Sequence, residues 1–274
     1  TYGVRRLNGT GFAGEYSAAL TANTNVKLTS SLAGAAVSIN SLISDSGFGI
    51  TTSANTLTIA SGNILATATA TIATATVIAF GANEGIIRAT SGTLTITSSI
   101  TGSGGVTFDG PGTINLTFNN PYTGTTTING TYTTTGAMTD LGLLKINSAG
   151  SYAKTDSTAV IFQGGLTYNG TTFTAGSGSY STSTVNLQTI GGSSSLYIPN
   201  FTCGGSLLTT FSGTISIDIL GNGGNNTIVS NGGTLTVNTA LTLNVARSYL
   251  TQKDNATLNI GGTLSLDSFS AGAN

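Results

Sequence analysis

Histidine is absent from this sequence, and charged residues are scarce. The 274 residues include 8 Lys and Arg and 9 Asp and Glu, which is 6% of the chain, against roughly 25% in an average globular protein. Without an imidazole, the chain cannot build a Ser-His-Asp triad, a Cys-His dyad or a histidine metal site. The acidic residues are scattered, and there is no P-loop, Cys-x-x-Cys or His-Glu-x-x-His motif. We therefore expect a protein that is not an enzyme and uses no cofactor or metal.

Clusters of positive charge and long apolar runs are missing as well. The net charge is −1, and Arg5-Arg6 is the one adjacent basic pair. Because binding to nucleic acid requires clustered Lys and Arg, we expect no nucleic-acid partner. The stretch 65–79 resembles a membrane segment, but it has 15 residues with five threonines, fewer than the ~20 apolar residues of a spanning helix. We expect no membrane span.

Cysteine occurs once. Cys203 has no partner for an intrachain disulfide, and we expect a buried structural thiol, the usual state of a free cysteine. The first residue is Thr1 and not Met, so we expect a processed or excised form. Low charge, abundant hydroxyl side chains and a single cysteine are typical of an extracellular protein on a bacterial surface, which is the location we predict.

What the sequence does contain is a recurring triplet, with an apolar residue on either side of Thr, Asn or Ser. In an extended strand the outer two residues of a triplet point to one face and the middle residue to the other. This pattern predicts strands with an apolar interior and a polar exterior. The triplets are Leu57-Thr58-Ile59, Leu94-Thr95-Ile96, Ile114-Asn115-Leu116, Ile215-Ser216-Ile217, Leu235-Thr236-Val237, Leu241-Thr242-Leu243, Leu258-Asn259-Ile260 and Leu264-Ser265-Leu266.

The stretch 65–79 alternates strictly but changes parity. Ala70 and Ile72 share one parity, whereas Ala73 and Val77 have the other. Side chains in a straight strand cannot change faces in this way, so we predict a corner or bulge near Ile72-Ala73.

Glycine clusters separate the triplets, and glycine allows the backbone angles of tight corners. Helical periodicity is absent, so the chain is predicted to be all-β. The spacing between successive triplets is irregular but often near twenty residues, which is about the length of one solenoid turn. We therefore predict a single elongated parallel β-solenoid, with a sandwich or jelly roll as the alternative, and asparagines that stack at equivalent corners. The expected corners are 102–105, 110–112, 191–192, 221–224, 232–233 and 261–262.

Several phrases between about Asn23 and Gly142 follow one another in an order known from a protein family. They are Asn83-Glu84, Thr93-Leu94-Thr95-Ile96, Gly102-Ser103-Gly104-Gly105, Gly110-Pro111-Gly112-Thr113, Asn120-Pro121-Tyr122-Thr123-Gly124 and Thr127-Ile128-Asn129-Gly130. This region, a little under half of the chain, resembles the passenger-associated repeat region of bacterial autotransporter and adhesin-like surface proteins. Asp109 is a departure, because the family usually has a Gly-Ala or Thr-Gly pair there.

The resemblance implies a right-handed parallel β-helix displayed outside a bacterial cell. Passenger repeats are scaffolding, so the resemblance implies no catalytic residues. We expect no C-terminal translocator barrel after Asn274, which is a second departure from the family. We divide the chain into an N-terminal cap or docking arm at 1–22 and a solenoid at 23–274, of which 23–142 resembles the passenger repeat.

The leading functional hypothesis is a structural protein that associates with itself head to tail, in a surface fibre, surface layer or adhesin stalk. The first and last turns of a solenoid expose unpaired strand edges, which act as templates for another copy. The N-terminal arm could dock on a neighbouring copy by strand addition. The candidate residues for self-association are Arg5, Arg6, Phe12, Tyr16, Leu264 and Leu266.

Other ligands are alternatives. A lateral face that binds glycans or a host surface could use Tyr168, Tyr180 and Tyr197 for stacking on sugars, although tyrosines pack equally well in a core. A weaker alternative is ice binding by the threonines between 67 and 76. The phrase 221–228 resembles a calcium-binding repeat, but Asn replaces the Asp that Ca²⁺ favours, and a neutral asparagine corner is the better interpretation.

Overall fold

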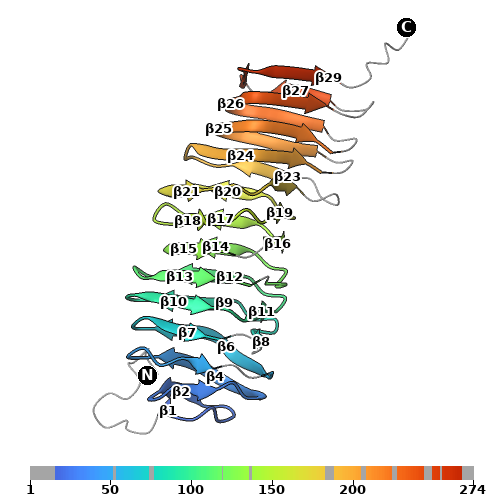
Figure 1. Cartoon of the computed structure of the whole chain (residues 1–274). Helices are drawn as coiled ribbons and strands as arrows, with labels where there is room; N and C mark the ends of the chain where they lie inside the picture. The colour runs from blue at the N-terminus through green and yellow to red at the C-terminus, as the bar shows by residue number, and fades with distance from the viewer. Residues whose placement is uncertain are drawn as a thin grey trace, which may run out of the picture. The chain divides into compact units, whose positions relative to one another are not determined.

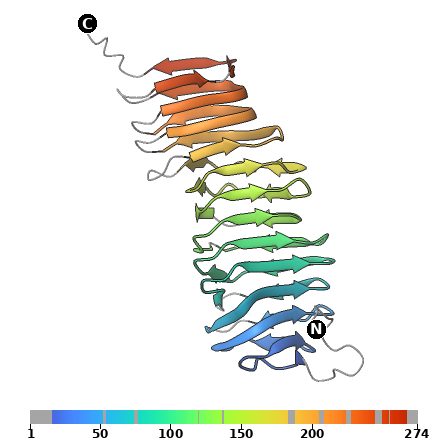
Figure 2. The ribbon, with the colours of Figure 1, turned by 180° about the vertical axis from the view of Figure 1, so that it is seen from behind.

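The computed structural model describes residues 16–51, 54–73, 77–118, 120–135, 138–182, 188–204, 208–223, 227–243, 249–253 and 255–266. In these residues the chain forms strands, turns and bends, and it contains no helix. The strands stack in parallel and form a β-solenoid of about 10 turns. Figures 1 and 2 show the stacked strands from opposite sides. The all-β, parallel solenoid that the sequence predicted is confirmed.

Contacts divide the chain into two compact units. Unit 1 comprises Thr1–Tyr122 and Gly130–Tyr132, and unit 2 comprises Thr123–Asn129 and Thr133–Asn274. The strand β15 (Thr131–Thr134) therefore has residues in both units. From the sequence, the solenoid was predicted as one domain.

Unit 1 contains the first thirteen strands. They are β1 (Tyr16–Ser17), β2 (Asn25–Leu28), β3 (Leu32–Ala33), β4 (Val37–Ser44), β5 (Ile50–Thr51), β6 (Thr56–Ala66), β7 (Ala70–Ile72), β8 (Val77–Ala79), β9 (Gly85–Ala89), β10 (Thr93–Ile96), β11 (Ser99–Thr101), β12 (Val106–Asp109) and β13 (Thr113–Leu116). The in-register partners Ile50, Ile72, Ile96 and Leu116 take the same position on successive turns, so the turns take 22, 24 and 20 residues.

Unit 2 contains the later strands. They are β14 (Thr126–Ile128), β16 (Met138–Leu141), β17 (Leu144–Ile146), β18 (Ser151–Lys154), β19 (Val160–Phe162), β20 (Leu166–Tyr168), β21 (Thr172–Thr174), β22 (Tyr180–Thr182), β23 (Gln188–Gly191), β24 (Leu196–Cys203), β25 (Leu208–Asn222), β26 (Thr227–Leu243), β27 (Tyr249–Lys253), β28 (Thr257–Ile260) and β29 (Thr263–Leu266). Tyr180, Phe201, Leu220, Leu241 and Leu264 form one inward column through this unit.

The interior forms as the triplets predict. In β6 and β10, Leu57, Ile59, Leu94 and Ile96 are completely buried, and the threonine between each pair lies half-buried on the outer face. The alternation of strand side chains thus places every second residue in the core. The last two triplets are the exception, because Leu258 and Ile260 are half-buried and Leu264 is exposed.

Aromatic rings stack where strands pair in register. Tyr152 in β18 and Phe173 in β21 are in-register partners, and their ring centroids lie 4.8 Å apart. This distance equals the spacing of adjacent strands in a sheet. Tyr168 packs against the same Phe173 edge-on, with centroids 5.6 Å apart. The turn-to-turn repeat therefore sets the geometry of the aromatic core.

Corners form at most of the expected glycines. Gly192 has φ 147°, and a Cβ there would lie 1.9 Å from the carbonyl oxygen of Tyr168 on the turn below. Only glycine allows so close an approach of two backbones at such an angle. Gly232 and Gly233 lie within β26, although both have a positive φ. Another predicted corner is displaced, because Gly221 and Asn222 still belong to β25. The strand continues there because Asn222 turns inward and is buried.

The chain bends twice in the stretch 65–79, once at the predicted place and once at a place that was not predicted. Strand β7 ends at Ile72, which confirms the corner near Ile72-Ala73. A second bend, at 67–69, separates β6 from β7. It was not predicted because Ala66 and Ala70 keep the same parity and both are buried on either side of it.

Asparagines at one corner stack as expected. Asn129 and Asn147 follow the paired residues Ile128 and Ile146 on successive turns of unit 2. The side chain of Asn147 donates from Nδ2 to Oδ1 of Asn129 over 2.6 Å. The predicted hydrogen bonding of corner asparagines along the stack is confirmed at this position.

Candidate functional site

The residues predicted for self-association are only partly described. Arg5, Arg6 and Phe12 lie outside the described residues. Tyr16 begins β1, is half-buried and pairs with Asn25 of β2. Leu264 and Leu266 lie in β29, where they pair with Leu241 and Leu243 of β26. Tyr16 belongs to unit 1, whereas Leu264 and Leu266 belong to unit 2.

The last turn exposes its apolar interior. Strands β27, β28 and β29 each pair along one edge with β26, and no described strand pairs with their other edges. Leu264 is 48% exposed, whereas Leu241 and Leu220, one and two turns below it in the same column, are completely buried. The last turn therefore combines unpaired backbone groups with uncovered apolar side chains, which is the surface that accepts another strand layer.

The first described turn differs. Val26 and Leu28 in β2 are buried, although they lie at the start of the stack. Strand β1 pairs in parallel with β2, with Tyr16 opposite Asn25 and Ser17 opposite Val26. The backbone of β2 therefore has a partner on each side, since β4 pairs with its other edge.

A polar cluster surrounds an exposed tyrosine on the outer face of unit 2. Tyr197 in β24 is 47% exposed, and its hydroxyl donates to Oδ2 of Asp218 in β25 over 2.5 Å. Asn238 in β26 donates from Nδ2 to Oδ1 of Asp218 over 2.8 Å and to Oγ of Ser216 over 2.9 Å. The four side chains come from three adjacent parallel strands, and we call them the Tyr197 cluster.

The charges of the Tyr197 cluster follow from these bonds. Hydrogen bonds from Tyr197 and Asn238 lower the pKa of Asp218, because they favour its carboxylate form. The bond to Asp218 raises the pKa of Tyr197. At neutral pH the cluster therefore presents a neutral tyrosine ring beside an ionised carboxylate.

Two of the three tyrosines considered for sugar stacking lie in the core. Tyr168 and Tyr180 are buried, and the hydroxyl of Tyr180 donates to the carbonyl of Ala175 over 2.7 Å. Burial raises the pKa of both phenols. They pack inside because they occupy inward positions of the alternation, so only Tyr197 of the three is available to a ligand.

The threonines considered for ice binding do not share one flat face. Thr67 and Thr69 lie in the bend between β6 and β7, and only Thr71 lies in a strand. Thr67 donates to Oδ1 of Asp45 over 2.5 Å, and Oγ1 of Thr69 accepts from the backbone N–H of Thr93 over 3.2 Å. Thr74 and Thr76 lie outside the described residues.

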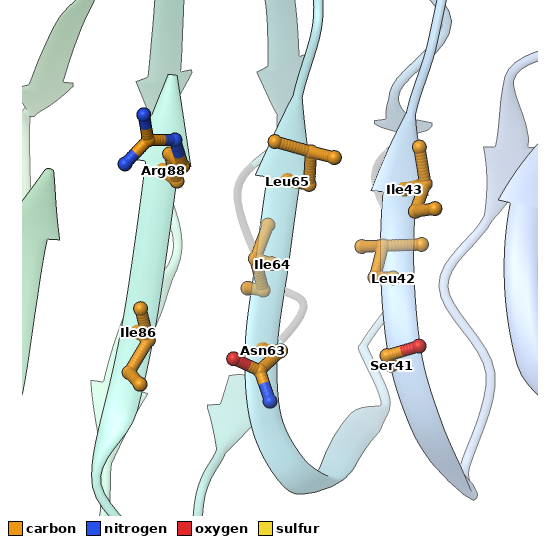
Figure 3. Close-up of a pocket in the computed structure, with 8 residues that line it drawn as sticks. All are labelled: Ser41, Leu42, Ile43, Asn63, Ile64, Leu65, Ile86 and Arg88. Carbon is orange, nitrogen blue, oxygen red and sulfur yellow. The ribbon is translucent and has the colours of Figure 1, made fainter. Parts of the chain in front are cut away.

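Unit 1 carries a shallow groove on its outer face (Figure 3). It crosses β4, β6 and β9 and has a volume of about 270 Å³. Ile43, Leu65 and Ile86 project outward among the lining side chains, although the outer faces of this chain are otherwise mostly Thr, Ser and Asn. Arg88 at one end pairs with Asp109, and Lys27 beyond the other end pairs with Asp45 over 2.8 Å. Both cations pair with a carboxylate within the unit, so the groove combines apolar side chains with charge that is locally balanced.

Cys203 is completely buried, which confirms the predicted structural thiol. Burial raises the pKa of its thiol to about 12. It lies in a buried polar group that the sequence analysis did not find, which consists of Thr182, Gln188, Cys203, Thr209 and Asn222. The hydroxyls of Thr182 and Thr209 lie 3.3 Å apart, and Thr182 accepts the backbone N–H of Gly204 over 2.9 Å. Gln188 donates from Nε2 to the carbonyl of Gln163 over 3.0 Å.

Sequence reasoning named Tyr197 but missed its partners Asp218 and Asn238. The available signal was spacing, because Tyr197, Asp218 and Asn238 are separated by about one turn each. Of the phrase considered for calcium binding, Asn222 is buried and 224–226 lie outside the described residues. Among the described residues, no three His, Cys, Asp or Glu side chains form a group able to hold a metal ion.

No family model, no curated protein and no solved structure gives a significant match to the chain. In the part of the chain that the structure describes, no helix is long and apolar enough to cross a membrane. The likeness to passenger repeats stays a prediction, and the solenoid geometry is the basis for a functional conclusion.

Proposed function

We propose that this chain is an extracellular, non-catalytic structural β-solenoid that associates with itself end to end in a fibre, surface layer or adhesin stalk. One observation carries the proposal, the uncovered last turn of unit 2. Leu264 is 48% exposed there, and the outer edges of β27, β28 and β29 have no partner among the described residues.

A second copy of the chain is the occupant that suits this surface. Every described strand pair in the solenoid is parallel. Each turn therefore pairs with the turn before it through one edge of its strands and with the turn after it through the opposite edge. The edge of β1 that faces away from β2 in another copy can thus continue the stack by parallel pairing and cover the column of Leu264. Such a contact joins two different surfaces and repeats without closing, which produces a filament.

The composition supports an extracellular location. Eight basic and nine acidic residues in 274 leave an outer surface made mainly of hydroxyl and amide side chains, and the resemblance to passenger repeats points to the same place. A stalk requires length and backbone pairing and no reactive group, which is consistent with the absence of histidine.

The test is the mass of the particles in solution. We expect light scattering after gel filtration to give species heavier than the 27.2 kDa monomer, growing with concentration, and negative-stain images to show filaments. Leu264→Lys places a charge on the open turn and should reduce association at least tenfold. Thr202→Lys, on the exposed outer face of β24, is the matched control and should associate like the original chain.

Two results would contradict the proposal. One is a chain that stays monomeric at every concentration up to the solubility limit. The other is association that Leu264→Lys leaves unchanged, because the contact would then lie elsewhere.

A further inference from the structure

We propose that the Tyr197 cluster is a binding site for a neutral sugar, with the tyrosine ring as the stacking platform and Asp218, Asn238 and Ser216 as hydrogen-bonding partners. This inference does not depend on end-to-end association, because the cluster lies on the lateral face formed by β24, β25 and β26, which are adjacent in Figure 1.

Tyr197 exposes a large aromatic ring on the outer face of β24. Buried tyrosines dominate this chain, as in Tyr122, Tyr132, Tyr152 and Tyr180, and Tyr197 instead presents 47% of its surface to solvent. Its in-register neighbours on the outer face are Ser216, Thr236 and Asn259, which are small or polar. The ring therefore forms an apolar plate at the edge of a polar surface, a combination that suits the C–H faces of a pyranose ring.

The ring of Tyr197 is held in one orientation by a hydrogen bond of its hydroxyl. A tyrosine on a surface normally loses side-chain freedom when a ligand binds, and that loss lowers the affinity. Here the hydroxyl is held by Asp218 over 2.5 Å, and Asp218 is held in turn by Asn238 over 2.8 Å. The platform is thus already in place before a ligand arrives.

Asp218, Asn238 and Ser216 keep hydrogen-bonding capacity beyond the bonds that they make to one another and to Tyr197. A carboxylate has about four lone-pair sites, and the described side chains use one on each oxygen of Asp218. Oδ1 of Asn238 accepts no hydrogen bond from a described residue, and the hydroxyl of Ser216 is engaged only as an acceptor, from Asn238. The cluster can therefore accept two or more hydroxyl protons and donate one, which matches adjacent hydroxyl groups of a sugar.

The charge decides which sugars fit. Asp218 is the one charged group of the cluster, and no cation among the described residues pairs with it. A sialic acid, uronic acid or sulfated sugar would meet an uncompensated negative charge, and a neutral hexose would not. The class of ligand is therefore a neutral oligosaccharide.

The experiment uses the full chain on a printed array of neutral and acidic oligosaccharides, followed by calorimetric titration with the best neutral ligand. Tyr197→Ala should weaken binding about tenfold or more, because the stacking surface is lost. Tyr197→Phe keeps the ring and should weaken binding less. Asn238→Ala tests the site without changing the tyrosine. Phe118→Ala, which removes another exposed aromatic ring in unit 1, should bind like the original chain.

The outcomes separate this inference from the proposed function. The titration is repeated with Leu264→Lys, so that binding is measured whether or not the chain associates. Circular dichroism confirms that each variant keeps its strands. The inference is overturned if no neutral sugar binds, if only acidic sugars bind, or if both Tyr197→Ala and Asn238→Ala bind as tightly as the original chain.

Discussion

The interior of residues 25–96 and the interior of residues 144–203 are built from different side chains on the same backbone plan. Among its described residues, the first is aliphatic, with Phe80 as the one buried aromatic ring and Ser44 as the one buried polar side chain. The second combines stacked aromatic rings with Lys154 and the polar group around Cys203. The alternation of buried and outward residues along the strands is alike in both.

This difference shows that stacking, and not the chemistry of the interior, defines the solenoid. Parallel backbone pairing continues through both regions, and each turn only requires that its inward residues fit those above and below. The regions should therefore respond differently to changes in the interior and alike to changes at the corners.

The largest effect is expected at the buried lysine of the second region. The side chain of Lys154 is completely buried and donates to Asp156 and, over 2.7 Å, to Oγ1 of Thr158. Asp156→Ala removes the carboxylate and leaves a buried positive charge without it, so the free energy of unfolding should fall by about 4 kcal/mol. Urea denaturation followed by circular dichroism measures the change.

Lys154→Met is the control for this prediction. It replaces the charge with an apolar chain of similar volume, so stability should change little. If Asp156→Ala were as stable as the original chain, the ion pair would have no part in holding the loop after β18.

The next effect is a cavity in the first region. Leu94 is completely buried between Ala70 and Ile114, its in-register partners. Leu94→Ala should lower the free energy of unfolding by about 3 kcal/mol, because the neighbouring strands cannot close the space. The same denaturation experiment tests it. Thr95→Ala, on the outer face of the same strand, should change the value by less than about 0.5 kcal/mol, and an equal loss at both positions would contradict the alternation.

The corners should behave alike in the two regions. Gly62 has φ 76° and Gly192 has φ 147°, and at each a Cβ would lie 1.9 Å from a backbone oxygen of the neighbouring turn. Alanine at either position should cost about 2 kcal/mol, because backbone has to move and the angles are strained. Gly81→Ala is the control, since its φ is 62° but no atom lies within 4 Å, and it should cost about half as much. Melting temperatures of the three variants decide the question.

The smallest expected effect is the loss of stability at acidic pH. Burial alone would raise the pKa of Asp156, but hydrogen bonds from Lys154 and Thr158 outweigh it and lower the pKa. A carboxyl group whose pKa is lower in the folded state adds stability above its unfolded value of 3.8 and loses it as the pH falls through the folded pKa. Melting temperatures should therefore drop below pH 4, and Asp156→Asn should remove part of that dependence.

Asp45 provides the comparison from the first region. A hydrogen bond from Lys27 and another from Thr67 lower its pKa, but the pair with Lys27 is solvent-exposed. Solvent screens such a pair, so Asp45→Asn should change the acid dependence less than Asp156→Asn. A larger change at Asp45 would reverse the contrast between the regions.

Much of the fold could be predicted from the sequence because its signals are local. The triplet Leu57-Thr58-Ile59 indicates which side chains point inward, and Gly192 indicates a corner. Neither prediction depends on any residue that is distant in the sequence. The bend at 67–69 escaped prediction because the parity of Ala66 and Ala70 is the same with or without it. Leu264 was named for self-association from its place in the last triplet, although its triplet is otherwise indistinguishable from Leu241-Thr242-Leu243.

The candidate sites could be predicted less well. Tyr168, Tyr180 and Tyr197 were equivalent in the sequence, and the structure buries two and exposes one. The partners of Tyr197 lie one and two turns along the chain, and their positions depend on the number of residues in each intervening corner.

By itself, the sequence determined the all-β class, the inward and outward faces and most corners of this protein, because alternation and glycine act within a few residues. Only the tertiary structure decided which turns are covered and which side chains meet across neighbouring turns. The physical reason is register, since contacts between turns depend on the sum of all corner lengths, and burial depends on whether another layer lies on top.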